Sequence, residues 1–205
     1  MAPTSTPRVR IGFTGYLRSG KDSAGSVVRD EHGFHHASFA AKLKDFLYAV
    51  DPPIRPATAP GANGPHLLSL AKVVDAVGWE RAKDEYPDVR PLLQRTGTEA
   101  GRKVLWDNVW VDALMGSLPD GDVVWTDCRF PNEATAIKES GGFLVRITRP
   151  GFEPGPDAHE SETALDDYPH DLYITNDGTL EDLRAKVLLA YESILHVLTH
   201  PDDAL

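Results

Sequence analysis

The chain has 205 residues, one cysteine and a formal net charge of −10, which suits a single α/β domain with a small inserted lobe and excludes an internal disulfide. The acidic balance argues against a broad nucleic-acid-binding surface, although a small anionic ligand needs only a local basic pocket. No apolar run reaches the roughly 18 residues of a membrane span and residues 1–7 lack a signal peptide's apolar core, so we expect a cytoplasmic protein that binds neither membranes nor nucleic-acid polymers.

The first predicted element is a strand at 9–14, which leads into the glycine-framed segment 15–23. The spacing of Gly15, Gly20 and Lys21 matches a phosphate-binding P-loop up to its lysine. In such a loop the glycines let successive backbone N–H groups surround a phosphate, and the lysine adds a mobile cation. Because the loop also opens a predicted helix, the bound anion would face a helix N-terminus. The sequence therefore predicts phosphate binding at this segment.

One loop position departs from the usual P-loop pattern. Asp22 stands where a Ser or Thr normally ligates magnesium, and the hydroxyl comes one residue later, at Ser23. The sequence leaves open whether Ser23 alone or Asp22 as well holds the metal. Arg18 adds a second cation to the loop, and we prefer this role to that of a solvated surface charge. The helix is predicted from Asp22 to about residue 31, with Gly33 ending it.

A second strand is predicted at 34–39, followed by an amphipathic helix at 40–50 that two prolines stop. The next stretch, 51–65, is rich in Pro, Gly and Ala and predicts a mobile surface loop. Helical periodicity returns over 66–79 and 89–104. Because these helices lie between predicted strands, we expect them to form a lid or a substrate lobe.

The second half of the chain predicts alternating strands and helices. Strands are predicted at 122–127, 143–148 and 172–174, and helices at 131–139 and after the capping residue Thr179. Pro131 suits the first turn of its helix, and the glycine-, proline- and acid-rich stretch 151–163 predicts a flexible flap. The apolar face of the closing helix is predicted to consist of Leu180, Leu183, Val187, Tyr191, Ile194 and Leu198.

An acid and a base follow the buried strand at 122–127. Asp127 is a natural partner for magnesium, directly or through water, because P-loop enzymes commonly place a carboxylate beside the loop; its alternative is to cap the next turn. Arg129 would hold an acceptor phosphate. Ligands of open α/β sheets bind at the carboxyl ends of the strands, and this favours the functional interpretation of both residues.

Further arginines lie beside predicted loops and strand ends. They are Arg95 and Arg102 in the predicted lobe, and Arg146 and Arg149 at the border of the flap. Any one of them is more often a surface charge, but phosphoryl transfer needs several cations around the transferred group. By contrast, His35 and His36 alternate along a strand, which argues against a zinc site, and Cys128 is interpreted as a small buried residue.

Taken together, these residues resemble the deoxynucleoside monophosphate kinases of tailed bacteriophages, a branch of the P-loop nucleoside monophosphate kinases. The resemblance covers nearly the whole chain and rests on separated blocks at 18–23, 38–42, 93–102, 110–112, 127–133, 160–162 and 176–178. It implies a P-loop NTPase-type three-layer α/β fold with a central, mainly parallel sheet. The core would comprise about 8–38, 120–150 and 170–205, with a helical acceptor-binding lobe at about 40–112 and a short lid at about 150–163.

The resemblance also implies a role for each matching residue. The donor ATP would bind Gly15, Ser19, Gly20, Lys21, Asp22 and Ser23, with Arg149 in the lid and Asn176 and Asp177 near the adenine. Ser23 matches the metal-side hydroxyl of the family, so the candidate Mg²⁺ ligands are Ser23, Asp22 and Asp127. The candidate acceptor-binding residues are Lys42, Gln94, Arg95, Arg102, Asp112 and Arg129. The predicted catalytic groups are Lys21, Arg18, Arg129 and Asp127.

The expected activity is transfer of the ATP γ-phosphoryl group to a dNMP, with Mg²⁺ as cofactor. Two alternatives stay open: a P-loop kinase acting on another small metabolite, such as dephospho-coenzyme A or a nucleoside, and a non-catalytic nucleotide-binding module. The acid-rich flap departs from the arginine-rich lid of the family, so the arginine that stabilises the transition state is not identified. Apolar helix faces fit a core and a homodimer interface equally well, and the sequence leaves a homodimer open.

Overall fold

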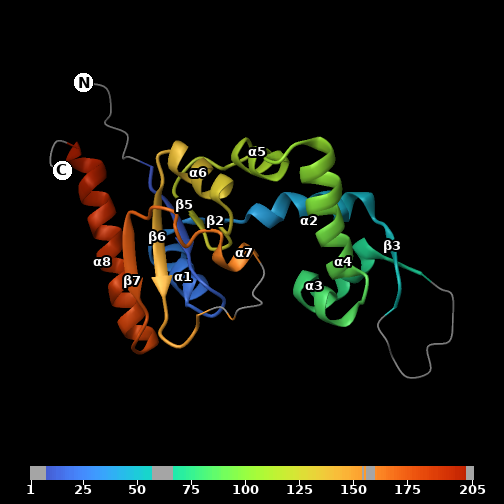
Figure 1. Ribbon diagram of the computed structural model, residues 1–205, viewed down its shortest axis with the longest axis horizontal. Coiled ribbons are helices and arrows are strands. Elements are labelled where there is room, and N and C mark those ends of the chain that lie inside the picture. Colours follow the sequence, from blue (N-terminus) through green and yellow to red (C-terminus); the bar gives the residue numbers. More distant parts are fainter. Residues whose placement is uncertain (1–7, 57–66, 154, 156–159, 202–205) are drawn as a thin grey trace. The chain divides into compact units, whose positions relative to one another are not determined.

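The computed structural model describes residues 8–56, 67–153, 155 and 160–201 (Figure 1). The chain folds into two compact units. Unit 1 comprises Met1–Ser38 and Ser117–Leu205, and unit 2 comprises Phe39–Gly116. The segment predicted to bind phosphate, residues 15–23, lies in unit 1.

Unit 1 is built on a five-stranded parallel sheet with the order β2-β5-β1-β6-β7. Its strands are β1 (Arg10–Thr14), β2 (His35–Ala37), β5 (Val123–Trp125), β6 (Phe143–Thr148) and β7 (Leu172–Thr175). Each falls inside or within one residue of a predicted strand, and the parallel α/β fold is confirmed. β1 is the central strand, and every residue from Ile11 to Thr14 is buried. The loop that follows β1 therefore starts from a fixed point in the middle of the sheet.

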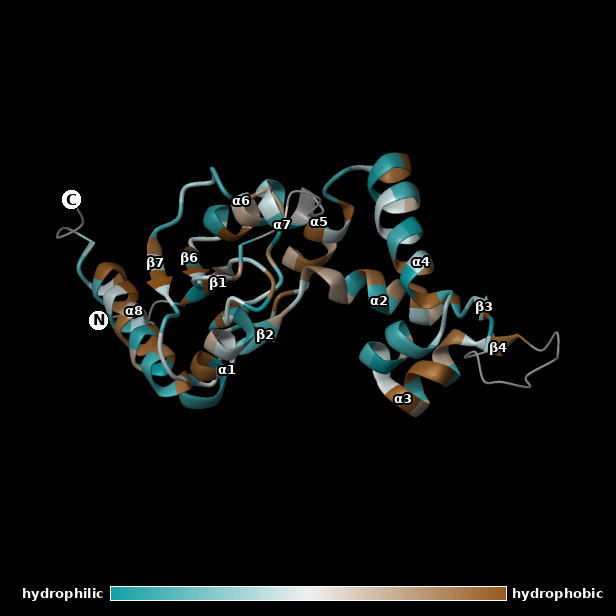
Figure 2. Ribbon diagram, turned by 60° about the horizontal axis from the view of Figure 1, so that its bottom comes forward, coloured by the Kyte–Doolittle hydropathy of each residue, from teal (hydrophilic) through white to brown (hydrophobic). Residues whose placement is uncertain are grey.

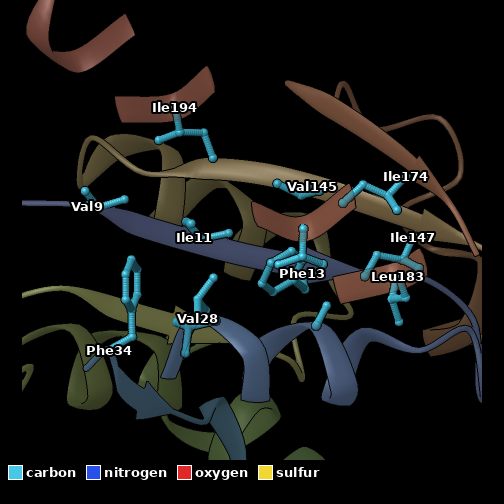
Figure 3. Close-up of a cluster of buried hydrophobic side chains, with 13 residues drawn as sticks. Val9, Ile11, Phe13, Val28, Phe34, Val145, Ile147, Ile174, Leu183 and Ile194 are labelled. Carbon is cyan, nitrogen blue, oxygen red and sulfur yellow. The ribbon is translucent and has the colours of Figure 1, made fainter. Parts of the chain in front are cut away.

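Helices cover both faces of this sheet. They are α1 (Lys21–His32), α6 (Pro131–Glu139), the short α7 (Glu160–Thr163) and α8 (Leu180–Thr199). On one face, Ile11 and Phe13 of β1 pack with Val28 of α1 and with Leu183 and Ile194 of α8 (Figure 3). On the other face, a Cβ added to Gly12 would lie 2.7 Å from the side chain of Ile137 in α6. The alternation along β1 produces the predicted three layers.

The ends of α1 and α8 follow the residues that predicted them. Gly33 ends α1 in the left-handed conformation (φ 73°), and its N–H donates to the carbonyl of Arg29. Thr179 and Asp182 form a reciprocal capping box at the start of α8. One prediction for α8 is wrong: Leu180 is 69% exposed, because the first turn of the helix borders an open pocket instead of the core.

Unit 2 is mainly helical. It contains α2 (Phe39–Val50), β3 (Pro53–Ile54), β4 (Leu68–Ser69), α3 (Leu70–Glu85), α4 (Val89–Gln94), the π-helix η1 (Arg95–Leu105) and α5 (Val109–Met115). Its separate core consists of Leu47, Ile54, Leu70, Val73, Ala82 and Val89. In Figure 2, polar and apolar residues are interspersed along the helices of both units. Among the described residues, no helix combines the length and apolar character needed to cross a membrane.

Three features of unit 2 differ from the predictions. The predicted surface loop at 51–65 contains β3, which pairs antiparallel with β4 because the fully buried side chain of Ile54 anchors it; residues 57–66 lie outside the described part. The first predicted lobe helix begins later and runs on to Glu85, bent at Gly78 (φ 76°). No element was predicted at α5, a helix of seven residues, which is too short for a clear period.

Candidate phosphate-binding site

The loop between β1 and α1 depends on its two glycines. Gly15 has φ 140° and Gly20 has φ 107°, values that side-chain-bearing residues rarely adopt. A Cβ at Gly15 would lie 2.3 Å from the backbone oxygen of Ile147 and 2.7 Å from Ser19 Oγ. A Cβ at Gly20 would lie 2.6 Å from the side-chain nitrogen of Asn176. The close approach of the loop to β6 and to the start of α8 therefore requires glycine at both positions.

Two polar side chains of the loop are buried without a strong partner. Ser19 is 1% exposed, and within the described part of the chain its Oγ has no hydrogen-bond partner. Lys21 is 7% exposed, and its Nζ donates to the carbonyl of Tyr16 at 3.2 Å. Burial lowers the pKa of Lys21, the nearby Asp22 carboxylate opposes that shift, and the Arg129 charge adds to it. An anion at this point would give Ser19 a hydrogen-bond partner and Lys21 a partner of opposite charge.

A pocket joins the loop to the chain after β5. Gly15, Lys21, Cys128, Arg129, Arg146, Glu162 and Leu165 line it. The structure thus brings together Lys21 and Arg129, which the sequence selected as catalytic, with Arg146, which it considered only as one of several further cations. Glu162, to which no role was given, lines the same pocket.

Asp127 and Arg129 follow β5 directly and are held by neighbouring groups. Asp127 Oδ2 accepts a hydrogen bond from Ser38 Oγ at 2.6 Å, at the end of the adjacent strand β2. The backbone N–H of Arg129 donates to Glu133 Oε2 at 2.8 Å, in the first turn of α6. Both side chains therefore lie at the carboxyl edge of the parallel sheet, where the sequence placed them.

Glu162 connects the loop to Arg129. Its Oε1 accepts from Arg129 Nη1 at 2.9 Å, and its Oε2 accepts from the backbone N–H of Leu17 at 3.0 Å. The sequence block 160–162 marked this stretch only as part of a family resemblance. An isolated glutamate in a predicted flap carries no local signal of a partner so distant along the chain.

An ionic network centred on the buried Arg146 supports the loop. Arg146 is 8% exposed; its Nη1 donates to the carbonyl of Leu165 at 2.9 Å and its Nη2 to Asp166 Oδ1 at 2.5 Å. The hydroxyl of Tyr16 donates to the same Asp166 oxygen at 2.9 Å, and the guanidinium of Arg146 lies 5.0 Å from the Tyr16 ring. Burial and the Asp166 hydrogen bond raise the pKa of Tyr16. Because Tyr16 also provides the carbonyl that Lys21 contacts, the network fixes the loop near its lysine.

Arg18 and Arg149 lie on the exposed side of the loop. Arg18 is exposed and has φ 64°, and its carbonyl accepts a long hydrogen bond of 3.5 Å from Arg149 Nη1. The guanidinium of Arg149 lies 4.4 Å from the Phe152 ring. Of the predicted flap, residues 154 and 156–159 lie outside the described part of the chain.

A second pocket opens at the N-terminus of α1. It is lined by Gly20, Ser23, Arg149, Asn176, Gly178, Thr179, Leu180 and Leu183. Asn176 is fixed there, because its Nδ2 donates to the carbonyl of Ser19 at 2.8 Å. Asp177 instead pairs with Lys186 at 2.6 Å, and this hydrogen bond lowers the pKa of Asp177. Four residues predicted to bind the donor nucleotide, namely Gly20, Ser23, Arg149 and Asn176, therefore share one pocket.

The predicted acceptor-binding residues other than Arg129 all belong to unit 2. Gln94 and Arg95 are exposed where α4 meets η1, and Arg95 lies 3.8 Å from Glu99. Further along η1, Arg102 lies 3.8 Å from Asp107. The two others are on different helices: Lys42 of α2 is 3.9 Å from Asp45, and Asp112 of α5 accepts from Trp106 Nε1 at 2.8 Å.

The candidate metal ligands are all oxygen donors. Among the residues that the structure describes, no group of three or more His, Cys, Asp and Glu side chains could hold a metal ion by itself. Asp22, Ser23 and Asp127 nevertheless offer carboxylate and hydroxyl oxygens, and Mg²⁺ is commonly bound through one or two carboxylates together with substrate phosphates. The donor set therefore fits a magnesium ion that arrives with a nucleotide.

Comparison with known proteins identifies related sequences. The sequence profile of a family described as deoxynucleotide monophosphate kinase matches residues 54–187. A putative deoxynucleotide monophosphate kinase of Acanthamoeba polyphaga mimivirus is 31% identical over 202 residues, which cover 88% of this chain and 94% of its own. The deoxynucleotide monophosphate kinase of Enterobacteria phage T4 is 26% identical over 62% of this chain and 54% of its own. That of Escherichia phage RB69 is 33% identical over 48% and 43%, so the match spans about half of each phage protein.

Proposed function

Because the chain belongs to the deoxynucleotide monophosphate kinase family, we propose that it transfers the γ-phosphoryl group of ATP to a deoxynucleoside 5′-monophosphate. The products are the deoxynucleoside diphosphate and ADP. The observation that best supports this proposal is that the buried Lys21 of the loop and Arg129 line the same pocket. Two cations converging beside a glycine-framed loop are what transfer between two phosphates requires.

The loop binds the phosphates of the donor. Its backbone N–H groups and the N-terminus of α1 face the anion, and the hydroxyl of Ser19 and the ammonium of Lys21 supply two further donors. Since burial lowers the pKa of Lys21, a phosphate beside it stabilises its charged form. These groups are already in place before the reaction, so they stabilise developing charge without reorganising.

Arg129 contacts phosphate near the point of transfer, and Arg18 adds a positive charge on the exposed side of the loop. The acceptor phosphate is the nucleophile and is already ionised near neutral pH, so the reaction needs no strong general base. Positioning and charge stabilisation therefore account for most of the catalysis. A magnesium ion, held by Asp127 and Ser23 with Asp22 beside them, would neutralise phosphate charge.

The two substrates differ in the residues that hold them. The donor nucleoside binds near Asn176 and Arg149, in the pocket at the start of α1. The acceptor monophosphate binds the residues of unit 2 predicted for it: Lys42, Gln94, Arg95, Arg102 and Asp112. The profile match to residues 54–187, which include most of unit 2, supports a family-specific role for this unit.

The test is a turnover panel on the Lys21→Ala variant. The wild type should convert at least one of the four dNMPs in a coupled ADP assay. Removing Lys21 should lower kcat by about 10²-fold or more, as loss of one preorganised donor does elsewhere, while circular dichroism stays unchanged. Lys72→Ala, which removes an exposed lysine of α3, is the matched control and should retain activity. Unchanged turnover in Lys21→Ala would refute the proposal.

A further inference from the structure

We infer that Glu162 is a positioning residue that orients Arg129 against the phosphate-binding loop during phosphoryl transfer. The inference rests on the proposed function and adds a residue to its machinery. The observation behind it is that the two carboxylate oxygens of Glu162 contact two separate parts of the site. Glu162 comes from α7, whereas Leu17 and Arg129 come from the chain after β1 and after β5.

The Arg129 side chain needs such a support. It is 43% exposed, and a long side chain that is free to move loses up to about 2 kcal/mol of rotamer entropy when a substrate fixes it. The bond from its backbone N–H to Glu133 holds only the main chain. Among the described residues, the 2.9 Å charge-assisted bond to Glu162 is the contact that holds the guanidinium itself. Part of the ordering is thus done before substrate binds.

The second carboxylate oxygen of Glu162 ties the Arg129 guanidinium to the loop. It accepts from the backbone N–H of Leu17, a group of the loop that follows the buried strand β1. The Glu162 side chain is only 22% exposed, half the value of Arg129. The guanidinium is therefore held relative to the loop that carries the donor phosphates, and not merely to a neighbouring surface charge.

An alternative role for Glu162 is to occupy the phosphate position and compete with ATP. The contacts argue against it. Glu162 bonds the N–H of Leu17, which is 61% exposed, whereas Ser19 Oγ has no partner in the described chain and Lys21 Nζ bonds the Tyr16 carbonyl. Ser19 Oγ and Lys21 Nζ are thus left for a ligand, whereas Glu162, which lines the same pocket as Lys21, bonds the Arg129 guanidinium and the exposed Leu17 N–H.

The decisive variant is Glu162→Gln, which removes the charge and one of the two acceptor oxygens at nearly constant shape. Its matched control is Glu153→Gln, because Glu153 lines the same surface pocket as Glu162 and, within the described part of the chain, accepts only from the nearby Gly151 N–H. Glu162→Gln should lower kcat about 10-fold, which corresponds to about 1.4 kcal/mol in the barrier. The Kd for ATP, measured by calorimetry, should change less than twofold in both variants, and their melting temperatures should match the wild type.

A second comparison separates positioning from a general effect of charge. In an Arg129→Ala background, Glu162→Gln should cause no further loss of kcat, because its target is gone. A full additional loss there would overturn the inference. So would tighter ATP binding with kcat retained, the signature of a competitor, or an unchanged kcat in the single variant. A wild type that turns over no dNMP would instead contradict the proposed function, and the inference would fail with it.

Discussion

The single cysteine of the chain, Cys128, lies in the candidate site, and its burial decides whether its thiol is reactive. Cys128 lies between Asp127 and Arg129, is 3% exposed and lines the pocket with Lys21. Burial, followed by the charges of Glu133 and Asp127, raises the pKa of its thiol well above the ordinary value. Since the thiolate is the reactive form, we expect Cys128 to be a structural residue of low reactivity and not a nucleophile.

This predicts a pH-dependent difference in thiol labelling. With Ellman's reagent, the native protein should react slowly from pH 7 to 9, because the buried thiol stays protonated as the pH rises through its ordinary pKa. The protein unfolded in guanidinium chloride should release one equivalent of thiolate product, and faster at higher pH. Rapid labelling of the native protein at pH 8 would show that the strand end after β5 opens readily.

Individual residues also show what the sequence could predict of the site. Gly15, Lys21, Asp127 and Arg129 lie on short stretches whose strand, turn and helix signals are local, and the structure brings Lys21 and Arg129 into one pocket. Glu162 and Asp166 had no predicted role, and Arg146 was considered only as one of several cations, because the partners of these residues lie more than a dozen residues away along the chain. A single charged residue forms no periodic pattern in the sequence from which its distant partner could be predicted.

At the scale of elements, Gly33, which ends α1, and Gly15, which directly follows β1, illustrate different uses of glycine. Gly33 ends the helix at φ 73° and has open space around its Cα. Gly15 precedes the helix at φ 140° and faces the Ile147 carbonyl and Ser19. A positive φ disfavours other residues at both positions. Of the two, only Gly15 also has a backbone atom, the Ile147 carbonyl oxygen, where a Cβ would lie.

The pair Gly15→Ala and Gly33→Ala should therefore separate stability from function. Gly33→Ala should lower the free energy of unfolding by about 1 to 2 kcal/mol, the cost of the left-handed conformation for an L-residue, with an unchanged Kd for ATP. Gly15→Ala should weaken ATP binding strongly, because the loop or β6 must shift to admit the methyl group. Chemical denaturation and calorimetry measure the two quantities. Equal ATP affinity in the two variants would contradict a role for Gly15 in shaping the loop.

Elements with strong local patterns were predicted within a residue or two, and weak ones were not. α8 and β6 have long apolar patterns, and Thr179 and Gly33 mark helix ends. The β3–β4 pair was missed because two-residue strands have no period, and their pairing joins Ile54 to Leu68 across a Pro- and Gly-rich stretch. Helical periodicity placed Leu180 on the apolar face of α8, but the pattern does not predict at which turn of the helix the core ends.

For the whole molecule, the sequence predicted a single P-loop domain with an inserted helical lobe, and the structure describes two compact units with separate cores. The core of unit 1 surrounds the parallel sheet, and that of unit 2 includes Leu70 and Ile54, both fully buried. Because the loop proposed to bind the donor phosphates belongs to unit 1 and most of the residues proposed to bind the acceptor belong to unit 2, a substitution that destabilises one core should weaken the binding of one substrate more than that of the other.

Leu70→Ala tests this division, with Leu144→Ala of β6 as its counterpart in unit 1; both leucines are fully buried. Each change should lower stability by about 2 to 5 kcal/mol, as large-to-small core substitutions do. In Leu70→Ala, amide hydrogen exchange measured by mass spectrometry should rise within 39–116, the KM for dNMP should increase, and the Kd for ATP should stay within twofold of the wild type. Leu144→Ala should instead raise exchange in the sheet and weaken ATP binding. A uniform rise across both units in either variant would mean that they open as one cooperative body, and the separation of donor and acceptor binding would then have no basis in independent cores.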